Sequence, residues 1–478
     1  MQQITPEIIK NGVLKHAKPP SPTPHEEVLK RLLGMVEDVN FYQEAGTDKP
    51  NKKHYIVITI EKILELAENN NWGLCKKHDF IYLYNGAYWS QLEEDHLETF
   101  LGQAARKMGV NKFDAHYYQF REKLLKQFMS FAHLPTPEKP DELVLINLEN
   151  GTVEINPASK VPVKIRPPKQ ADFLTYQLPF RYDNKASSPR FTQYLDEVLP
   201  DRDMQQLLAE FVGYVFVNTS TLKLEKALIL LGPGGNGKSV FFEIINALLG
   251  NENVSTYTLQ SLTDKSGYYR AKLANRLVNY ASEINGSMDT ALFKQLVSGE
   301  PVEARLPYGE PFILTDYAKL IFNCNELPTD VEHTTAFFRR FMIVPFDKTI
   351  PEDQQDKELA ANIIRNELSG VFNWVLDGLQ RLLKQRGFTS CEVVEKQNEK
   401  YRIESDSVLK FLNESNYKKS IELYVTLSTI FSEYKGFCGE DGYYPVGKSK
   451  FKKRLQNSGI KVTRKSVGNI VYLRRSQQ

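Results

Sequence analysis

The chain has few cysteines for its length and no long apolar run. Among its 478 residues there are 4 cysteines, which are widely separated and form no C-x-x-C pair. This scarcity argues against a zinc site or a disulfide framework. No apolar run approaches the roughly 20 residues that span a bilayer, and the amino terminus lacks the apolar segment of a signal peptide. We therefore expect a reduced, cytoplasmic protein with no membrane partner.

A large excess of one charge is also missing. The chain has 61 Lys and Arg against 59 Asp and Glu, for a formal net charge of +2. The protein as a whole is therefore not a polycation, and any surface that binds nucleic acid must be local. The length is sufficient for about three domains.

The most informative segment is a glycine-rich loop. Residues 232–239 read Gly-Pro-Gly-Gly-Asn-Gly-Lys-Ser and complete the pattern G-x-x-x-x-G-K-[ST]. The apolar run 227–231 precedes the loop, and the amphipathic stretch 240–249 follows it. Strand, glycine loop and helix form the context that a phosphate-binding loop requires. The residues expected to bind a nucleotide are Gly232, Pro233, Gly234, Gly235, Asn236, Gly237, Lys238 and Ser239.

This residue pattern predicts ATP and Mg²⁺ as cofactors. Glycines let backbone N–H groups turn toward phosphate oxygens, and the following helix adds its partial positive charge. Lys238 would reach the β- and γ-phosphates, and the Ser239 hydroxyl would ligate Mg²⁺. The motif alone does not separate a motor from a switch or a phosphotransferase.

Three further segments offer catalytic groups. The strand-like run 276–283 ends in Glu283, whose carboxylate could polarise the attacking water and lie near Mg²⁺. A second apolar run ends at Asn325, which could orient water against the γ-phosphate. Arg339 and Arg340 lie between a predicted helix and strand, where one could act on a neighbouring subunit as an arginine finger.

The ordered set of motifs resembles a superfamily 3 helicase of the phage/plasmid primase and poxvirus helicase-primase group. The resemblance rests on the glycine loop, residues 281–283, the segment 294–305 and the strand end at 325–328. It implies an AAA+-like homo-hexameric ring that moves along single-stranded or forked DNA. The sequence shows no primase-polymerase motif, so we expect primer synthesis to need a separate primase or polymerase.

In such rings a hairpin points into the pore. Here the corresponding segment is 302–313, with Arg305 at its base and Tyr308 near its tip. Lys294 is the basic residue that matches the family motif upstream of the hairpin. The resemblance therefore implies that Lys294, Arg305 and Tyr308 contact DNA, although other branches carry Lys or His at the hairpin tip.

The carboxyl-terminal segment is locally basic. Residues 420–478 contain 11 Lys and Arg against 4 Asp and Glu, a local net charge of 11 − 4 = +7. A helix with one basic face followed by a basic-tipped hairpin is typical of a winged helix that contacts DNA phosphates. The DNA-binding residues expected in this module are Lys452, Lys453, Arg454, Arg464 and Lys465.

The overall prediction is an α/β fold with a P-loop, AAA+-like core. Asn85-Gly86 and Asn150-Gly151 each predict a hairpin in an α+β domain ahead of that core. The expected parts are a flexible arm over 1–55, an α+β domain over 56–215, the ATPase core over 216–350, a helical extension over 351–415 and a winged-helix module over 416–478.

These observations favour an ATP-dependent replicative DNA helicase of a phage, plasmid or other mobile element. An alternative is a replication initiator that binds an origin and uses ATP only to switch its assembly. A phosphotransferase is a weaker third interpretation, because the paired arginines and the basic carboxyl terminus do not suit it.

Overall fold

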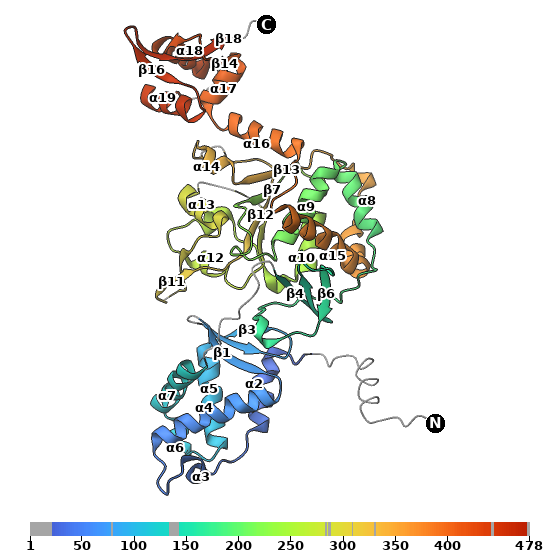
Figure 1. Ribbon diagram of the computed structural model, residues 1–478, viewed down its shortest axis with the longest axis vertical. Helices are drawn as coiled ribbons and strands as arrows, with labels where there is room; N and C mark the ends of the chain where they lie inside the picture. Colours follow the sequence, from blue (N-terminus) through green and yellow to red (C-terminus); the bar gives the residue numbers. More distant parts are fainter. Residues whose placement is uncertain are drawn as a thin grey trace. The chain divides into compact units, whose positions relative to one another are not determined.

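A computed structural model describes residues 22–77, 80–132, 143–282, 284, 288–307, 309–328, 331–440 and 444–475 (Figure 1). The chain divides into two compact units, Met1–Tyr182 and Asp183–Gln478. The expected boundary at residue 215 therefore moves to residue 182. The reason is that the helices between 189 and 214 pack against a helix near residue 380 of the second unit.

The first unit contains a helical body. Its helices are α2 (His25–Met35), α3 (Phe41–Ala45), α4 (Lys52–Asn69), α5 (Glu94–Lys107), α6 (Lys112–His116) and α7 (Tyr118–Phe131). Val28 and Leu32 of α2 are fully buried in one apolar core with Leu97 and Phe128. Residues 25–55 are thus packed where the sequence led us to expect a flexible arm. Val28 and Leu32 lie one helical turn apart, and their burial stabilises the packing of α2 although the surrounding sequence is polar.

Two antiparallel sheets complete this unit. One consists of β1 (Gly73–Lys77), β2 (Phe80–Tyr84) and β3 (Trp89–Leu92), and the other of β4 (Val144–Leu148), β5 (Gly151–Ile155) and β6 (Val163–Arg166). The turns at Asn85-Gly86 and Asn150-Gly151 join β2 to β3 and β4 to β5, so both hairpin predictions are confirmed. Gly86 has a φ of 97°, a conformation that favours glycine.

A five-stranded parallel sheet forms the centre of the second unit. Its order is β13 (Phe341–Pro345), β7 (Ala227–Leu231), β12 (Lys319–Cys324), β9 (Val278–Ala281) and β8 (Val254–Ser255). Every neighbouring pair in this sheet is parallel. Ala227 to Leu230 are fully buried, as expected for a strand covered on both faces. The predicted α/β class is confirmed.

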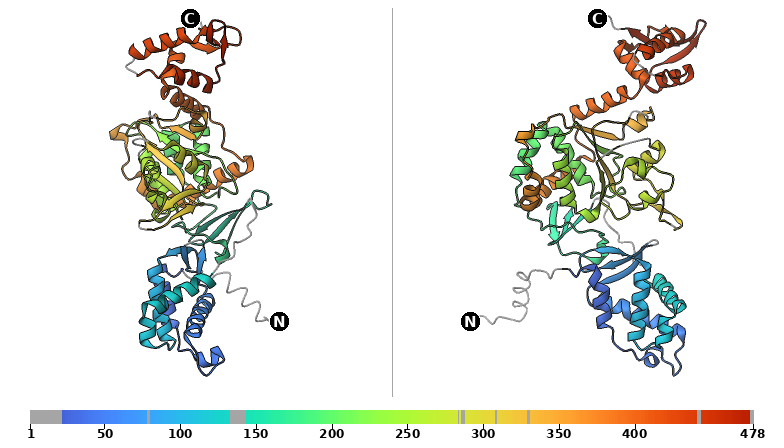
Figure 2. Two further views of the ribbon diagram at one scale, coloured as in Figure 1. Left: turned by 90° about the vertical axis from the view of Figure 1, so that its left-hand side faces the viewer. Right: turned by 180° about the vertical axis from the view of Figure 1, so that it is seen from behind.

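Helices cover both faces of this sheet (Figures 1 and 2). One side carries α8 (Pro189–Val198), α9 (Arg202–Tyr214), α10 (Lys238–Leu249) and α15 (Leu359–Gln385), and the other carries α11 (Leu259–Leu262), α12 (Tyr268–Ala271) and α13 (Thr290–Ser298). Helices α9 and α15 approach closely, since a Cβ at Gly378 would lie 2.4 Å from the carbonyl carbon of Ala209. The fully buried carboxylate of Glu210 accepts a hydrogen bond from Arg381 Nε at 2.6 Å across the same contact.

The segment between β9 and β12 contains the expected hairpin. Strands β10 (Val302–Arg305) and β11 (Pro311–Leu314) pair in antiparallel fashion, with Val302 opposite Leu314 and Arg305 opposite Pro311. The short helix α14 (Thr335–Phe338) then precedes β13.

The carboxyl-terminal module has its own apolar core. Helix α16 (Glu392–Glu404) precedes it, and it consists of α17 (Ser407–Glu414), β14 (Tyr417–Lys419), β15 (Val425–Thr426), α18 (Leu427–Glu440), α19 (Lys448–Asn457), β16 (Val462–Lys465), β17 (Gly468–Val471) and β18 (Leu473–Arg475). Phe411 of α17 is buried together with Ile430, Phe451 and Leu455. Because α17 belongs to this core, the module begins near residue 407 and not at the expected residue 416.

Candidate nucleotide and nucleic-acid sites

The glycine loop lies between β7 and α10, at the carboxyl end of a central strand. Strand β7 ends at Leu231 and helix α10 begins at Lys238, so the predicted strand and helix are present on either side of the loop. Ligands of open α/β sheets bind outside the carboxyl ends of the parallel strands. The loop is therefore placed where such a fold binds a ligand.

Two features of the loop require glycine. Gly235 and Gly237 have φ values of 72° and 87°, in the left-handed region that side chains disfavour. A Cβ at Gly232 would lie 2.3 Å from the backbone oxygen of Phe346. By contrast, a Cβ at Gly234 would meet nothing within 4 Å, and residues 233–235 are exposed. The middle of the loop is thus open, while its two ends are held tightly.

Lys238 is buried and bonded to its own loop. Its Nζ donates to the backbone oxygens of Gly232 at 2.5 Å and Pro233 at 3.0 Å, and to Asn236 Oδ1 at 3.1 Å. These contacts match the three donors of an ammonium group. Burial lowers the pKa of Lys238 from its ordinary value. An incoming anion would replace some of these acceptors and favour the charged form of the lysine.

Contacts that the sequence did not reveal hold the loop from outside. Tyr194 of α8 donates from its hydroxyl to the backbone oxygen of Gly237 at 2.8 Å. The segment after β13 contributes two more bonds, because Asn236 Nδ2 donates to Phe346 O at 2.7 Å and Ile350 N donates to Gly235 O at 2.8 Å. The partners lie 43 and more than 100 residues away along the chain, so local sequence patterns carry no signal for them.

The residues of the loop fit a nucleotide phosphate chain. The open, exposed stretch 233–235 leads into the twelve-residue helix α10, whose first-turn N–H groups attract anions. Ser239 is exposed in that first turn, so its hydroxyl is accessible to a metal ion bound to the phosphates. Among the residues that the structure describes, no group of three or more His, Cys, Asp or Glu side chains gathers to hold a metal.

Three strand ends meet at this edge of the sheet. Strand register places Cys324 of β12 beside Leu231 of β7, and Ala281 of β9 beside Phe322. Asn325 directly follows Cys324 and is exposed at this edge. Glu283, the proposed base, lies outside the described residues, two positions after Ala281. The register brings Asn325 to the glycine loop, as its predicted role requires.

A buried polar pair supports the same strands. Tyr280 of β9 donates from its hydroxyl to Asn323 Oδ1 of β12 at 3.1 Å, and burial raises the pKa of this tyrosine well above its ordinary value. Burial also raises the pKa of the Cys324 thiol to about 12, so the thiol next to the loop stays protonated. Sequence reasoning missed both groups, because they stand within otherwise apolar strands.

The two adjacent arginines have different environments. The side chain of Arg340 is only 10% exposed, and its guanidinium donates to Ser298 Oγ at 2.9 Å and to the backbone oxygen of Ala336. The side chain of Arg339 is 55% exposed, and its guanidinium lies 2.5 Å from Glu225 Oε2. Arg339 is therefore the more accessible of the two candidate fingers.

The residues predicted to contact DNA in and before the hairpin are partly engaged within the chain. Lys294 Nζ donates to Glu332 Oε2 at 2.8 Å, and Arg305 Nε donates to the backbone oxygen of Gly309 at 2.8 Å. The bond from Lys294 is the main reason that the pKa of Glu332 is lowered. Tyr308 lies outside the described residues.

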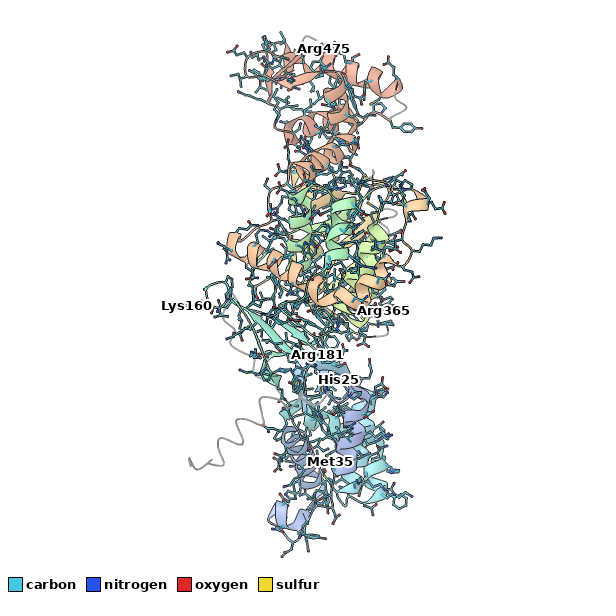
Figure 3. The ribbon with its side chains drawn as sticks, turned by 90° about the vertical axis from the view of Figure 1, so that its right-hand side faces the viewer. His25, Met35, Lys160, Arg181, Arg365 and Arg475 are labelled. Carbon is cyan, nitrogen blue, oxygen red and sulfur yellow. The ribbon has the colours of Figure 1, made fainter. Side chains whose placement is uncertain are left out.

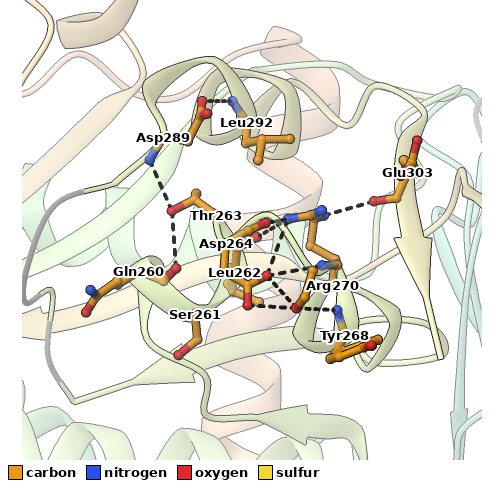
Figure 4. A network of polar contacts seen from close by, with 12 residues as sticks. Gln260, Ser261, Leu262, Thr263, Asp264, Tyr268, Arg270, Asp289, Leu292 and Glu303 are labelled. Carbon is orange, nitrogen blue, oxygen red and sulfur yellow. Dashed lines mark hydrogen bonds and ion pairs between the residues drawn. The ribbon is translucent and has the colours of Figure 1, made fainter. Parts of the chain in front are cut away.

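A buried arginine ties the base of this hairpin to α12 and its preceding loop (Figure 4). Arg270 is 4% exposed. It donates from Nε to the backbone oxygen of Glu303 at 2.9 Å, and from Nη1 to the backbone oxygens of Leu262 and Asp264. In the same network the Asp289 N–H, which stands just before α13, donates to Thr263 Oγ1 at 3.3 Å. The network thus joins the β10–β11 hairpin to Asp289, in the segment between β9 and α13.

In the carboxyl-terminal module the predicted basic residues separate into two groups. Arg454 is tied to the buried Asp406, with Nη1 3.0 Å from Oδ1, and Lys452 is half-buried. Lys453, Arg464 and Lys465 are exposed. Lys448 and Lys450, on the same helix α19 as Lys453, are exposed as well, so both α19 and the hairpin of β16 and β17 present cations to solvent.

Comparison with known families supports this organisation. The family described as "D5 N terminal like" matches residues 61–200, and "Poxvirus D5 protein-like" matches residues 403–468. Between them, "Family of unknown function (DUF5906)" matches residues 230–340, which include the glycine loop and both arginines. These matches support a helicase-primase family for the chain. This confirms the resemblance seen in the sequence.

Individual relatives of this family are distant. "Putative helicase L207/L206" of Acanthamoeba polyphaga mimivirus is 26% identical over 175 residues, which are 35% of this chain and 18% of the relative. "Putative helicase 121R" of Invertebrate iridescent virus 3 is 22% identical over 320 residues, which are 58% of this chain and 33% of the relative. The chain thus spans at most about a third of the length of these relatives.

Solved structures of the NrS-1 carboxyl-terminal region, determined without ligand, also align with this D5-like chain. One covers 87% of this chain and 99% of the NrS-1 chain at 12% identity, with a TM-score of 0.49. A second covers 88% of this chain at 12% identity, with a TM-score of 0.48.

Within the described residues, no helix is long and apolar enough to cross a membrane.

Proposed function

We propose that this D5-like protein is an ATP-dependent replicative DNA helicase. The observation that carries the proposal is the glycine loop at the carboxyl edge of the parallel sheet. Its lysine is buried within the loop, and the exposed asparagine that ends the neighbouring strand lies at the same edge. The viral relatives named as helicases give this NTP site its context.

In the proposed reaction each residue has one task. Lys238 leaves its loop acceptors and neutralises charge on the β- and γ-phosphates, and Ser239 supplies a hydroxyl ligand to Mg²⁺. Glu283 accepts a proton from the attacking water, while Asn325 orients that water. When bound, Mg²⁺ stabilises charge that develops on the transferred phosphoryl group.

The proposal includes a homo-hexameric, AAA+-like ring of the superfamily 3 type. Arg339 is the candidate finger because its side chain is 55% exposed although it pairs with Glu225, whereas the side chain of Arg340 is only 10% exposed and bonds to Ser298. The β10–β11 hairpin, with Arg305 and Tyr308, and Lys294 of the preceding helix α13 would contact the single strand in the pore. The carboxyl-terminal module, proposed to be a winged helix, would contact DNA outside the pore.

ATP hydrolysis and strand separation by matched variants test this function. The Lys238→Ala protein should lose both activities, because no other cation is placed in the loop to stabilise the phosphates. Lys357→Ala removes an exposed lysine of the same unit and should behave as wild type. Hydrolysis by Lys238→Ala at the wild-type rate would show that ATP is turned over elsewhere.

A replication initiator is the second candidate, favoured by the net positive charge of the carboxyl-terminal module. Both candidates hydrolyse ATP, so the discriminating measurement is displacement of a labelled strand from a preloaded fork. Sustained displacement that requires ATP supports the helicase. Binding and ATP turnover without displacement would favour the initiator.

A further inference from the structure

Four side chains form a continuous row on the carboxyl-terminal module. Lys461 Nζ lies 5.2 Å from the centre of the Tyr472 ring, and Lys465 Nζ lies 4.3 Å from the centre of the Tyr424 ring. The two rings lie 6.1 Å apart with an angle of 64° between their planes. The order along the surface is therefore Lys461, Tyr472, Tyr424 and Lys465, with a cation at each end.

The side chains of the row are accessible to solvent, and backbone hydrogen bonds hold part of the backbone that carries them. Lys461, Lys465 and Tyr424 are exposed, and Tyr472 is half-buried. The backbone N–H of Tyr472 donates to the Lys461 oxygen at 3.0 Å, and the N–H of Ser420 donates to the Tyr472 oxygen at 3.2 Å. These bonds fix the backbone at Lys461, Tyr472 and Ser420, so this part of the surface does not have to be ordered when a ligand arrives.

The surroundings add apolar surface and further positive charge. Ile421 and Leu423, in the loop that carries Tyr424, are 91% and 60% exposed. On the adjoining strand β18, Arg475 lies over the ring of Tyr417, with 5.5 Å between its guanidinium carbon and the ring centre, and its position is labelled in Figure 3. Glu422 is the exposed carboxylate of the loop. Tyrosine faces, apolar edges and flanking cations are the groups that contact bases and phosphates of a single strand.

We propose that this row, Lys461, Tyr472, Tyr424 and Lys465, binds unpaired bases of single-stranded nucleic acid. It deepens the DNA contact that the proposed function assigns to this module, and it adds a role that phosphate contacts alone do not give. A base stacks on a tyrosine ring and displaces the lysine ammonium from the ring face. The displaced ammonium then meets the phosphate of the same strand.

The geometry favours a single strand over a duplex. In a duplex the base faces are covered by neighbouring base pairs, so a tyrosine ring can stack only on a base that has left the helix. The usual duplex-binding element of a winged helix would here be α19. Its Arg454 is paired with Asp406, and its exposed Lys450 and Lys453 can meet phosphates but offer no ring on which a base could stack.

The test is photocrosslinking of the full-length chain, without nucleotide, to an oligothymidylate that carries 5-iodouracil, followed by mass spectrometry of the linked peptide. The expected crosslink is at Tyr424 or Tyr472. Tyr444 is 97% exposed and is not part of the row, so it serves as the matched control tyrosine. Crosslinks at Tyr444 in equal yield, or none at Tyr424 and Tyr472, would overturn the proposal.

Equilibrium binding gives an independent readout. Tyr424→Ala should weaken oligothymidylate binding by roughly tenfold and leave duplex binding unchanged, because loss of one stacking partner affects only unpaired bases. Tyr424→Phe keeps the ring and should restore the affinity. Lys465→Ala should weaken single-strand and duplex binding together, with a smaller dependence on salt.

Equal losses for both nucleic acids in Tyr424→Ala would refute the stacking role. An unchanged single-strand affinity would do the same. Neither measurement requires ATP turnover. A failure here is therefore distinguishable from a failure of the proposed helicase function, which the Lys238→Ala assay reports.

Discussion

The buried arginine at the base of the hairpin provides a sharp test of how the proposed ATP and DNA sites communicate. We predict that Arg270→Met uncouples them. The side chain of Arg270 holds the backbone oxygen of Glu303, in the hairpin, to the oxygens of Leu262 and Asp264 (Figure 4). Methionine fills similar space but donates no hydrogen bond, so the hairpin base would be released.

The size of the effect follows from the lost bonds. Each buried carbonyl that loses its donor costs about 1–3 kcal/mol, and three carbonyls are involved here. Removal of a buried charge offsets part of that cost, because the nearest carboxylate, on Asp264, is 4.0 Å away. We therefore expect a net loss of about 2–4 kcal/mol, seen as a fall in Tm of roughly 5–10 °C.

The assay compares basal ATP hydrolysis, its stimulation by single-stranded DNA, and fork unwinding. Arg270→Met should keep basal hydrolysis, because the glycine loop is untouched, and lose DNA stimulation and unwinding. Lys272→Met removes an exposed cation from the end of the same short helix and serves as the control. Arg270→Lys retains a charge without the fork of donors and should be intermediate. Full DNA stimulation in a folded Arg270→Met protein would refute the tether.

Two further predictions concern charged groups of the same unit. Mixing Arg339→Ala subunits with Lys238→Ala subunits should restore ATP hydrolysis, because an intact finger can meet an intact loop across one interface. The rescue should be measurable, since arginine fingers contribute about 10³–10⁵ in rate. A lack of rescue at every mixing ratio would count against a shared site. Burial lowers the pKa of Lys319 to about 8, against an ordinary value of 10.5. Between pH 8 and pH 10.5 the unfolded chain therefore binds more protons at this lysine than the folded chain does, and the free energy of unfolding rises with pH in that interval. Lys319→Met should therefore raise Tm at pH 7, with the gain shrinking toward pH 10; a lower Tm at pH 7 would show that the bond to Thr219 outweighs the cost of burial.

The glycine loop and its flanks were predictable because their signals are local. Gly235 and Gly237 adopt backbone conformations that only glycine enters easily, so the motif records the geometry directly. The buried strand at 227–231 and the helix at 238–249 follow from their apolar patterns. The contacts from Tyr194 and Ile350 follow from tertiary packing, which a single sequence does not display.

The boundaries of the parts were less predictable for a related reason. Prolines and lysines around α2 suggested an arm, yet Val28 and Leu32 find a core built mainly from residues after position 55. Likewise α8 and α9 belong with α15, more than 140 residues later, because the close approach of Gly378 to Ala209 needs both helices. The composition of a segment indicates whether it could remain exposed to solvent. It does not predict whether the segment is buried, because burial depends on residues that lie elsewhere in the chain.

Charge gives the clearest case of this limit. In the sequence Arg339 and Arg340 are equivalent, as are Lys453 and Arg454, and each was predicted to serve a ligand. In the structure Arg340 bonds to Ser298 and Arg454 pairs with Asp406, while their neighbours remain exposed. Lys453 and Arg454 lie in helix α19, where adjacent residues point about 100° apart, so one of two neighbouring cations can meet a buried acceptor while the other faces solvent. Arg339 and Arg340 lie in the turn after α14, where their side chains also diverge. A basic cluster in a sequence therefore gives an upper bound on the charge available to a ligand, and in this module the exposed cations are divided between α19 and the β16–β17 hairpin.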